Sequence, residues 1–414
     1  MNKRVLLIAG NFFPEPTGIG KYNGEMIDLL ASQGYECTVV TSYPYYPYWK
    51  VQEPYSINYS RYTKEIRYPE LTGSSPVEIF RCPIYVPHNP TAKKRMLLDF
   101  SFCFFSFFKI LQLLFRKKYD YVITVVPCFQ IGLLAVLYKK IKGAKFLYHI
   151  QDLQIDAARD LKMIQSQTLL NALLSVEKYI LKNADLVSSV SPGMIKRIRA
   201  KYKREIIFFP NWVDTKLFYP LEGRAMLKEE FNFCAGDKII LYSGAIGEKQ
   251  GLESIIYAAE LLKHRTSLKF VISGTGPYKE RLEELKNNLK LENVVFLPLQ
   301  PFENLNKLLN MADVHLVLQK AHASDLVMPS KLTNILSVGG IAIISACENT
   351  SLYDIVSLNK IGILIEPEDK QALTTAIEHA LKDDNKKINQ NARSYAEEFL
   401  SIEKIIPGYT FHMQ

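Results

Sequence analysis

The sequence predicts two α/β domains in tandem, each a doubly wound parallel sheet of the Rossmann type. Short apolar strands alternate with helical stretches along most of the chain, as in parallel sheets that helices cover on both faces. This series runs once, passes a polar turn and then starts again. A chain of 414 residues is also too long for one ordinary core, so two domains of roughly 200 residues each are expected.

The first series opens at residues 5–9 (VLLIA), a short apolar run that Gly10 closes. Such a run is typical of a strand buried on both faces of a parallel sheet. A turn-rich loop follows, and then a helix from about residue 20 to residue 34. Four further strands are expected in this domain, at residues 37–41, 121–125, 146–149 and 186–190.

The second series starts after residues 206–209 (IIFF), which run into a polar turn at residues 210–214 (PNWVD). We expect an N-terminal domain over residues 1–205 and a C-terminal domain over residues 206–395, with residues 396–414 packing back on the first domain. Open α/β sheets bind ligands at the carboxyl ends of their strands, so two such sheets facing each other place a site in the cleft between them. The strands of the second domain are expected at residues 238–243, 268–273, 294–297, 314–318, 341–345 and 362–365.

The composition is that of a folded protein with surplus positive charge. Lysine and arginine number 51 against 42 acidic residues, a formal charge of +9, which favours anionic partners such as nucleotide phosphates or anionic lipids. No RNA-binding signature is present, so nucleic acid is not an expected partner. The six cysteines form no CxxC or CxxH pair, which argues against a metal or redox site. The N-terminal apolar run is too short for a signal peptide, and a cytoplasmic protein is expected.

Residues 96–115 (MLLDFSFCFFSFFKILQLLF) form a long apolar stretch with basic residues at 93–95 and 116–118. A transmembrane helix needs about 20 apolar residues, but Asp99 and Lys109 inside the stretch disfavour a span. A helix lying in the membrane interface and a buried crossover helix of the sheet are the two main interpretations. A second basic stretch at residues 196–204 adds weight to a membrane surface as a partner of this domain.

Three glycine-rich or capped turns follow predicted strands and suit a phosphorylated ligand. Residues 11–20 (NFFPEPTGIG) place Gly18 and Gly20 where a helix begins, but they lack the dinucleotide fingerprint. Residues 243–252 (SGAIGEKQGL) hold Lys249 in a glycine-rich turn that suits a diphosphate and lacks the Walker pattern. The alternatives are a plain strand-to-helix turn for the first loop and a solvated loop lysine for the second.

The third turn lies near Pro329, which is favourable at the start of a helix. Ser330 is expected to cap that helix and leave N–H groups for an anion, and Asn334, one turn in, suits ribose hydroxyls. At the end of a first-domain strand, His149 is expected to face the cleft, where it can bond a sugar oxygen. An ordinary capped helix and a structural histidine are the alternatives. Residues 43–49 (YPYYPYW) form an aromatic loop that suits sugar stacking or a membrane interface.

Taken together, these stretches resemble glycosyltransferase family four, the retaining enzymes with the GT-B fold. The likeness covers nearly the whole chain and is strongest towards bacterial exopolysaccharide and O-antigen transferases of the colanic-acid and N-acetyl-fucosamine type. The motifs that carry it are FFPEPTGIGKY at residues 12–22, HIQD at 149–152, FFPNWVDTKLF at 208–218, YSGAIGEKQGLE at 242–253 and MPSKLTNILSVGG at 328–340.

The resemblance implies a nucleotide-sugar donor, a glycan or lipid-linked saccharide acceptor, and no metal or other cofactor. It places His149 at the transferred sugar and Lys249 at the diphosphate, and we group Asp152 with these two as catalytic. The residues that we expect to bind the donor are Gly18, Gly20, Ser243, Gly244, Lys249, Gly274, Lys320, Ser330, Lys331 and Asn334. For Ser330 and Lys331 the resemblance implies contacts through backbone amides.

The chain departs from the family pattern at two points. Members often carry two glutamates eight positions apart, and here Asn334 takes the second position while Leu326, next to Asp325, takes the first. Many members also carry an arginine near the position of Ala245. Lys320 and Lys331 are the candidates for that second positive charge.

Two other classes of function compete with a sugar transferase. A nicotinamide-dependent oxidoreductase on a Rossmann fold requires a GxGxxG turn, which the first loop lacks. A non-catalytic nucleotide-sugar-binding protein is compatible with the charge of the chain, and only a test for nucleotide release separates it from an enzyme.

Overall fold

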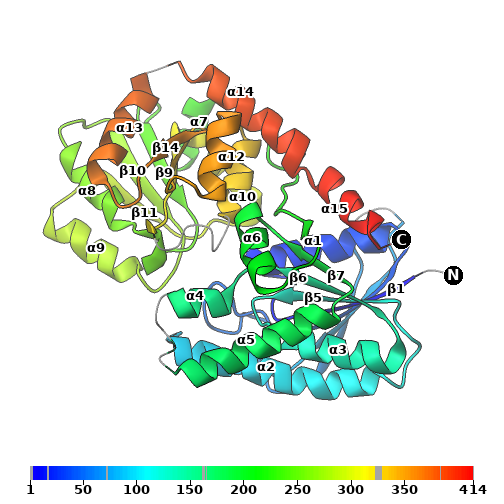
Figure 1. The fold of residues 1–414 in the computed structure, drawn as a ribbon. Helices are drawn as coiled ribbons and strands as arrows, with labels where there is room; N and C mark the ends of the chain where they lie inside the picture. The colour runs from blue at the N-terminus through cyan, green and yellow to red at the C-terminus, as the bar shows by residue number, and fades with distance from the viewer. Residues whose placement is uncertain are drawn as a thin grey trace. The chain divides into compact units, whose positions relative to one another are not determined.

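The computed structural model describes residues 3–15, 18–70, 73–160, 164, 166–321, 329–382 and 384–413. The chain divides into two compact units (Figure 1). The N-terminal unit holds residues 1–210 and 409–414, and the C-terminal unit holds residues 211–408.

The division lies slightly later in the chain than the sequence suggested. It falls after Pro210 rather than after residue 205, because the short strand β8 (Ile207–Phe208) still pairs in parallel with β7 (Leu186–Ser189) of the first sheet. At the C-terminus, only residues 409–414 of the expected tail 396–414 belong to the N-terminal unit.

Within the described residues, the N-terminal unit is built on an eight-stranded sheet in the order β3-β4-β2-β1-β5-β6-β7-β8. Neighbouring strands are parallel except for the antiparallel pair β3 and β4. The order reverses between β1 and β5, the kind of switch point at which open α/β sheets bind ligands. The other strands are β1 (Arg4–Ala9), β2 (Glu36–Thr41), β3 (Thr63–Arg67), β4 (Val77–Arg81), β5 (Tyr121–Val126) and β6 (Lys145–Ile150).

Helices cover both faces of this sheet. In Figure 1, α2, α3 and α5 lie on one face, and α1 and α6 lie on the other. The basic stretch at residues 196–204 belongs largely to α6, so it does not share a face with α2. The bounds are α1 (Gly18–Ser32), α2 (Ala92–Leu113), α3 (Ile131–Lys142), α4 (Gln154–Asp160), α5 (Gln167–Asn183), α6 (Pro192–Lys201) and the 3₁₀ turn η1 (Tyr55–Ile57).

The C-terminal unit repeats this construction with a six-stranded parallel sheet in its described part, in the order β11-β10-β9-β12-β13-β14. Its switch point lies between β9 and β12. The strands are β9 (Lys238–Ser243), β10 (Leu268–Ser273), β11 (Val294–Leu297), β12 (Val314–Val317), β13 (Ala342–Ser345) and β14 (Ile363–Ile365). The helical elements are α7 (Arg224–Glu230), η2 (Glu248–Gln250), α8 (Glu253–Leu261), α9 (Lys279–Asn288), α10 (Phe302–Met311), α11 (Ser330–Ser337), α12 (Ser351–Asn359), α13 (Lys370–Lys382), α14 (Lys386–Tyr395), η4 (Ala396–Leu400) and α15 (Ile402–Phe411).

Both faces of the C-terminal sheet are buried, as the apolar strand sequences predicted. Side chains alternate across a strand, so Ile239 and Leu241 of β9 pack into one core while Ile240 and Tyr242 pack into the other. The predicted strands of both units are confirmed to within one or two residues. The pair β3 and β4 was missed. Strand β3 reads TKEIR, and its residues alternate between half-buried and exposed, so it lacks the buried apolar run that marks the other strands.

Helix α2 is apolar on two opposite sides. Its inner side, formed by Leu98, Phe102 and Ile110, is buried against the N-terminal sheet. Its outer side is exposed and carries mainly phenylalanine. Residues 93–113 are the one helical stretch in the described chain that is long and apolar enough to cross a membrane.

Candidate functional site

The candidate site lies at the turn after β9, next to the switch point of the C-terminal sheet, and this turn packs against the turn after β10. The backbone N–H of Gly244 donates to the Ser273 carbonyl at 2.9 Å, and the N–H of Ile246 donates to the Thr275 carbonyl at 2.9 Å. A Cβ on Gly274 would lie 1.9 Å from the Gly244 carbonyl oxygen, so only glycine allows the two turns to approach this closely. Gly274 therefore shapes the turn that begins after Ser243.

The side chain of Lys331 reaches over the end of β9. Its Nζ lies 3.5 Å from the centroid of the Tyr242 ring and 3.0 Å from where a side chain on Gly244 would begin. This nitrogen is buried and has no hydrogen-bond partner among the described residues. Burial first, and the nearby positive charge of Lys249 second, lower the pKa of Lys331 from 10.5 to about 7.

Two more buried polar atoms in this region have no partner among the described residues. They are Oε1 of Gln250, directly after Lys249, and Oδ1 of Asn334, one helical turn after Lys331. Buried polar atoms in native proteins are nearly always hydrogen-bonded, and exceptions call for an explanation such as a missing ligand. Three such atoms, one on η2 and two on α11, mark this as a place where a polar ligand binds.

Lys249 and Lys320 bring two further positive charges to the same place. The backbone N–H of Lys320 donates to the Lys249 carbonyl at 2.9 Å, which joins the loop after β12 to the turn after β9. The aliphatic stem of Lys320 lies over Gly251, 3.3 Å from where a Cβ would stand. Lys249 itself is exposed. The structure thus assembles three lysines that the sequence analysis had assigned separately.

The start of α11 differs from the expectation in one detail. Pro329, rather than Ser330, occupies the N-cap position, and no side chain in the described residues caps this helix. The expected Ser330 cap is therefore wrong, because the helix already begins at Ser330. Its first-turn N–H groups remain available to an anion. Asp325 and Met328, which entered the sequence analysis, lie outside the described residues.

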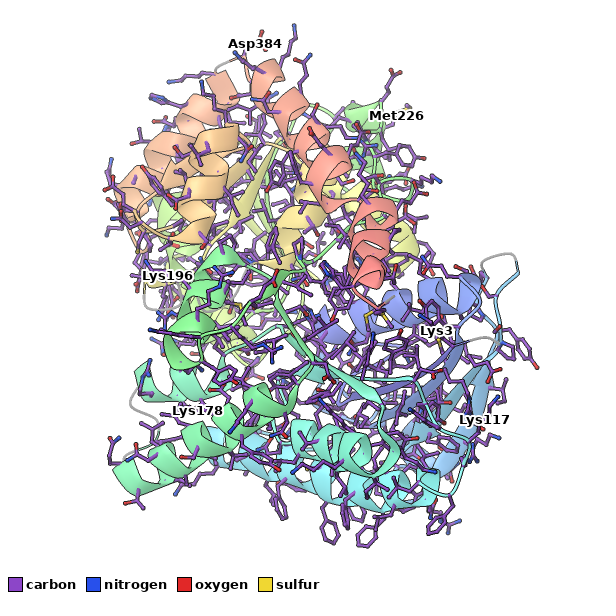
Figure 2. All side chains as sticks on the ribbon, turned by 45° about the vertical axis from the view of Figure 1, so that its right-hand side comes forward. Lys3, Lys117, Lys178, Lys196, Met226 and Asp384 are labelled. Carbon is purple, nitrogen blue, oxygen red and sulfur yellow. The ribbon has the colours of Figure 1, made fainter. Side chains whose placement is uncertain are left out.

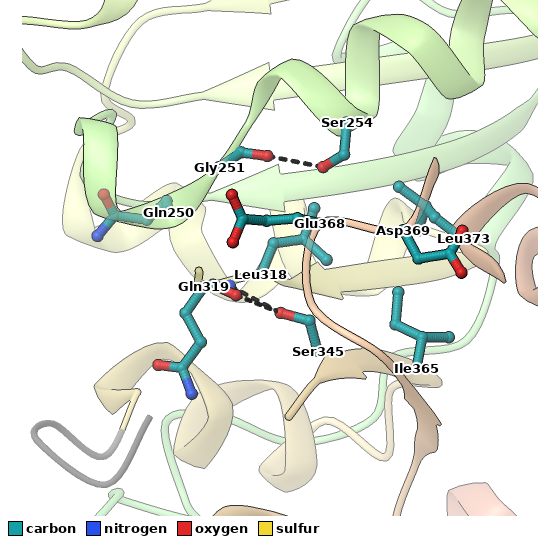
Figure 3. Close-up of a pocket in the computed structure, with 10 residues that line it drawn as sticks. All are labelled: Gln250, Gly251, Ser254, Leu318, Gln319, Ser345, Ile365, Glu368, Asp369 and Leu373. Atoms are coloured by element: carbon teal, nitrogen blue, oxygen red, sulfur yellow. Dashed lines mark hydrogen bonds between the residues drawn. The ribbon is translucent and has the colours of Figure 1, made fainter. Parts of the chain in front are cut away.

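A hollow lies beside the lysines in the same unit. Figure 3 shows its side chains converging from the ends of β12, β13 and β14 and from the starts of α8 and α13. Ser345 accepts from the Gln319 backbone N–H at 2.8 Å and donates to the Gln319 carbonyl at 2.9 Å. Sequence reasoning missed most of these residues, because they come from five separated segments. The lining is Gln250, Gly251, Ser254, Leu318, Gln319, Ser345, Ile365, Glu368, Asp369 and Leu373.

In the N-terminal unit, the turn after β1 is fastened to the aromatic loop by Glu15. Its carboxylate accepts from the backbone N–H groups of Tyr45 at 3.0 Å and Tyr46 at 2.9 Å, and from Asn11 Nδ2 at 2.9 Å. Burial raises the pKa of Glu15 to about 7. Gly20 allows the turn to fold onto the helix, since a Cβ there would meet the Glu15 side chain at 2.7 Å. The sequence analysis had assigned Glu15 no role.

His149 is not placed as expected. Its side chain is only 2% exposed and packs edge-on against Phe209, with ring centroids 4.9 Å apart, and beside Tyr409. One ring nitrogen, Nδ1, shares a hydrogen bond of 2.9 Å with Ser188 Oγ. Burial lowers the pKa of His149 to about 3, so it is neutral. The expectation that it faces an open site is wrong, because the returning C-terminal segment covers the end of β6.

Asp152 has an unexpected neighbour. Burial raises the pKa of Asp99 on α2 to about 7, and the negative charge of Asp152 adds to this shift, while the Gln154 side chain hydrogen-bonds Asp99. The sequence analysis had treated Asp99 only as an obstacle to a membrane span. The structure places it beside the loop that follows β6.

Metal ligands do not gather anywhere in the part of the chain that the structure describes: no group of three or more His, Cys, Asp or Glu side chains is arranged to hold an ion. All six cysteines are free thiols.

Sheet order, glycine turns and clustered lysines define the class as a two-domain transferase of the GT-B type. The fold of sucrose-phosphate synthase from Thermosynechococcus elongatus matches 100% of this chain and 99% of that chain, with a TM-score of 0.76 and 19% identity. HepE of Anabaena, solved in complex with UDP-glucose, matches 100% of this chain and 99% of that chain, with a TM-score of 0.70 and 14% identity. At these identities the likeness establishes the fold alone, and the predicted fold class is confirmed.

Sequence comparison then identifies the family. The family described as Glycosyl transferases group 1 matches residues 224–399, and the Glycosyl transferase 4-like domain matches residues 17–212. WcaI of Escherichia coli K12, named a putative colanic acid biosynthesis glycosyl transferase, is 40% identical over 411 residues, which cover 97% of this chain and 98% of that protein. The chain belongs to this family of glycosyltransferases, as its motifs predicted.

Proposed function

We propose that the protein transfers a hexose or deoxyhexose from a UDP- or GDP-sugar to a glycan acceptor in bacterial surface polysaccharide synthesis. The observation that carries the proposal is the buried ammonium of Lys331 without a counter-ion, beside Lys249. Burying a charge is unfavourable unless it is paired, so this position calls for an anion of high charge. The diphosphate of a nucleotide sugar fits two lysines and the first-turn N–H groups of α11.

The donor's other parts have complementary neighbours in the same unit. Asn334 Oδ1 lacks a partner and lies one turn along α11 from Lys331, a position that suits a ribose hydroxyl donor. At the rim of the hollow, the side-chain amides of Gln250 and Gln319 are in place to bond hydroxyls of the donor. HepE, with the same fold, was solved with UDP-glucose, which supports a donor of this class.

The mechanism we propose is transfer with retention of configuration. The bond from the sugar's anomeric carbon to the diphosphate breaks, and the leaving diphosphate gains negative charge that Lys249, Lys331 and the amides of α11 stabilise. The acceptor hydroxyl attacks from the face that the diphosphate leaves, and a phosphate oxygen takes its proton. No protein nucleophile is required. His149, being neutral and enclosed, serves in positioning the end of β6.

The acceptor we propose is a lipid-linked saccharide, met at the inner face of the cell membrane. The name of WcaI supports an exopolysaccharide product. The exposed apolar side of α2 supports an acceptor anchored in lipid. On the N-terminal unit, the turn with Gly18 and Gly20 and the loop fastened by Glu15 are the surfaces that we assign to it.

Two measurements test the proposal. A thermal-shift panel of UDP- and GDP-sugars is expected to single out one donor, because a ligand at 100 times its Kd stabilises by about 2.7 kcal/mol. That donor, supplied with an acceptor extract, is expected to release free nucleotide, and NMR of the product is expected to show the donor's anomeric configuration. Binding without nucleotide release would support the non-catalytic alternative, and an inverted product would refute retention.

A further inference from the structure

The outer side of α2 forms a continuous apolar strip on the surface of the N-terminal unit. Phe100 is 63% exposed, and its ring lies near that of Phe104, with centroids 6.4 Å apart, while the Phe104 and Phe108 centroids are 5.2 Å apart. Aromatic rings project outward from this helix along its length (Figure 2). A surface helix of a globular domain normally carries polar residues on this side. The exposed apolar residues are Met96, Leu97, Phe100, Phe104, Phe107 and Phe108.

The two charged residues within α2 do not interrupt the strip. Asp99 is half-buried beside the loop after β6, and the Gln154 side chain hydrogen-bonds it. Lys109 turns aside, with its Nζ 4.7 Å from the centroid of the Phe80 ring and a hydrogen bond of 2.8 Å to Gln112 Oε1. The two charges that disfavoured a membrane span in the sequence are therefore directed away from the outer side.

The inner side of the same helix excludes a transmembrane arrangement. Leu98, Phe102 and Ile110 are buried in the domain, and the Phe102 ring lies 3.8 Å from where a Cβ on Gly10 would stand. Removing α2 from the sheet would expose these residues to water. The helix can meet lipid only along its outer side, while it remains packed on its own domain.

Basic residues at both ends of α2 complement an anionic surface. Lys93, Lys94 and Arg95 occupy the first turn, which contains no acidic residue. The helix dipole disfavours cations there by about 0.3–1 kcal/mol each, so their presence calls for an external anion. At the other end, the exposed Lys117 and Lys118 follow the helix. A strip of phenylalanine between basic ends is the pattern of an interfacial helix that binds anionic lipid head groups.

We propose that the outer side of α2 docks the N-terminal unit on an anionic lipid bilayer, with its phenylalanines in the acyl boundary and its basic ends on the phosphates. A second copy of the chain is a poorer occupant. Because both ends of α2 are positive, either orientation of two such helices side by side would bring like charges together.

Docking through α2 also places the turn after β1 near the membrane. The Arg95 guanidinium lies 4.8 Å from the centroid of the Trp49 ring, and the loop containing Trp49 is held to Glu15 through the backbone of Tyr45 and Tyr46. Glu15 in turn packs on Gly20 at the start of α1. One chain of contacts thus joins the membrane-facing helix to the surface that we assign to the acceptor.

Vesicle sedimentation of the full chain tests the docking. Binding is expected to phosphatidylethanolamine vesicles containing about one third phosphatidylglycerol, and only weakly to phosphatidylcholine vesicles. Replacing Phe100 and Phe104 together by serine is expected to weaken binding at least tenfold. Replacing Lys93 and Lys94 together by glutamine is expected to weaken it by about fivefold per lysine, on the anionic vesicles alone.

Matched variants on the C-terminal unit serve as controls. Leu358→Ser removes an apolar side chain that is 81% exposed, and Lys386→Gln with Lys387→Gln removes two lysines from the first turn of α14. Both are expected to bind vesicles like the unchanged protein. Undiminished vesicle binding by the phenylalanine variant, or a dimer by light scattering that this variant abolishes, overturns the proposal. Donor binding measured without vesicles is expected to be unchanged in every variant, so failure of the docking and failure of the proposed transferase activity are distinguishable.

Discussion

Replacing Lys331 by methionine is expected to stabilise the unliganded protein and to weaken donor binding at the same time. Methionine keeps an unbranched stem of similar length and removes the ammonium that lies over the Tyr242 ring. A residue that only supports the fold would lose stability when truncated in this way. Opposite effects on stability and on binding are the signature of a buried charge kept for its ligand.

The size of the stability effect follows from the pKa of Lys331. That pKa is lowered from 10.5 to about 7, and each pKa unit corresponds to about 1.4 kcal/mol, so burying the ammonium costs the unliganded protein up to about 5 kcal/mol. The lost contact with Tyr242 offsets about 0.5–2 kcal/mol of this. The net gain is then about 3 kcal/mol, and since 1 kcal/mol shifts Tm by about 2–4 °C in a domain of this size, a rise of at least about 6 °C is expected.

Because the pKa of Lys331 is lowered on folding, its effect on stability depends on pH. Between pH 7 and pH 10.5 the unfolded chain holds the Lys331 proton more firmly than the folded chain, so the contribution of Lys331 to the stability of the unliganded protein rises with pH in that window. In Lys331→Met this rise is expected to disappear. Charge-assisted hydrogen bonds are worth about 1.5–3 kcal/mol, so donor binding is expected to weaken roughly 10- to 150-fold.

Differential scanning calorimetry and donor titration of the purified variant measure both effects. Lys228→Met is the matched control, because Lys228 is buried in the same unit but pairs with Asp313 at 2.8 Å and with the Asp237 carbonyl at 2.6 Å. That control is expected to lose about 3–5 kcal/mol of stability. If Lys331→Met were also destabilised, or if it bound the donor unchanged, the reasoning about an unpaired cation would be refuted.

Three further predictions concern other residues. Lys249→Ala is expected to raise the donor KM or lower kcat at least tenfold, and to leave Tm unchanged because Lys249 is exposed. Steady-state kinetics check this against Lys263→Ala, which removes another exposed lysine, and unchanged kinetics contradict it. Gly274→Ala is expected to destabilise the C-terminal unit and to weaken donor binding, because the new Cβ would overlap the Gly244 carbonyl. Denaturant unfolding measures the effect beside Gly236→Ala, a site with open space around it, and equal unfolding midpoints for the two variants count against the close packing. Between pH 6.5 and pH 3, His149 lowers the free energy of unfolding by about 1.4 kcal/mol per pH unit as pH falls, because the unfolded chain binds a proton that the folded chain excludes; His149→Gln is expected to remove this contribution. Urea unfolding at several pH values measures the slope, and an unaltered slope argues against a neutral buried histidine.

Much of the fold could be predicted because parallel strands buried on both faces carry their signal locally. Residues 5–9 and 239–242 read as parts of strands without any tertiary information, since every side chain there is buried. The strand β3 could not be found in this way. Its sequence, TKEIR, suits an edge strand with one exposed face, and only its antiparallel pairing with β4 makes it part of the sheet.

Part of the site could also be predicted, because its turns are recognisable from short local stretches of sequence. Glycine turns after strands and the lysine at position 249 are visible as motifs, and the family they indicated is confirmed. The directions of side chains were not visible. Whether His149 faced outward depended on a C-terminal segment some 250 residues away, which brings Tyr409 over it. Likewise, the role of Lys331 lay in an ammonium that no sequence pattern marks as buried.

The sequence by itself determined the two-domain α/β architecture, the family and the loops that carry the donor site. These features depend on short-range patterns of apolar residues, glycine and proline, which act within one strand or turn. Only the tertiary structure decided which charges lack partners, which side of α2 is exposed and which histidine is enclosed. Burial and pairing are properties of contacts between segments distant in the chain, and these arise only when the sheets assemble.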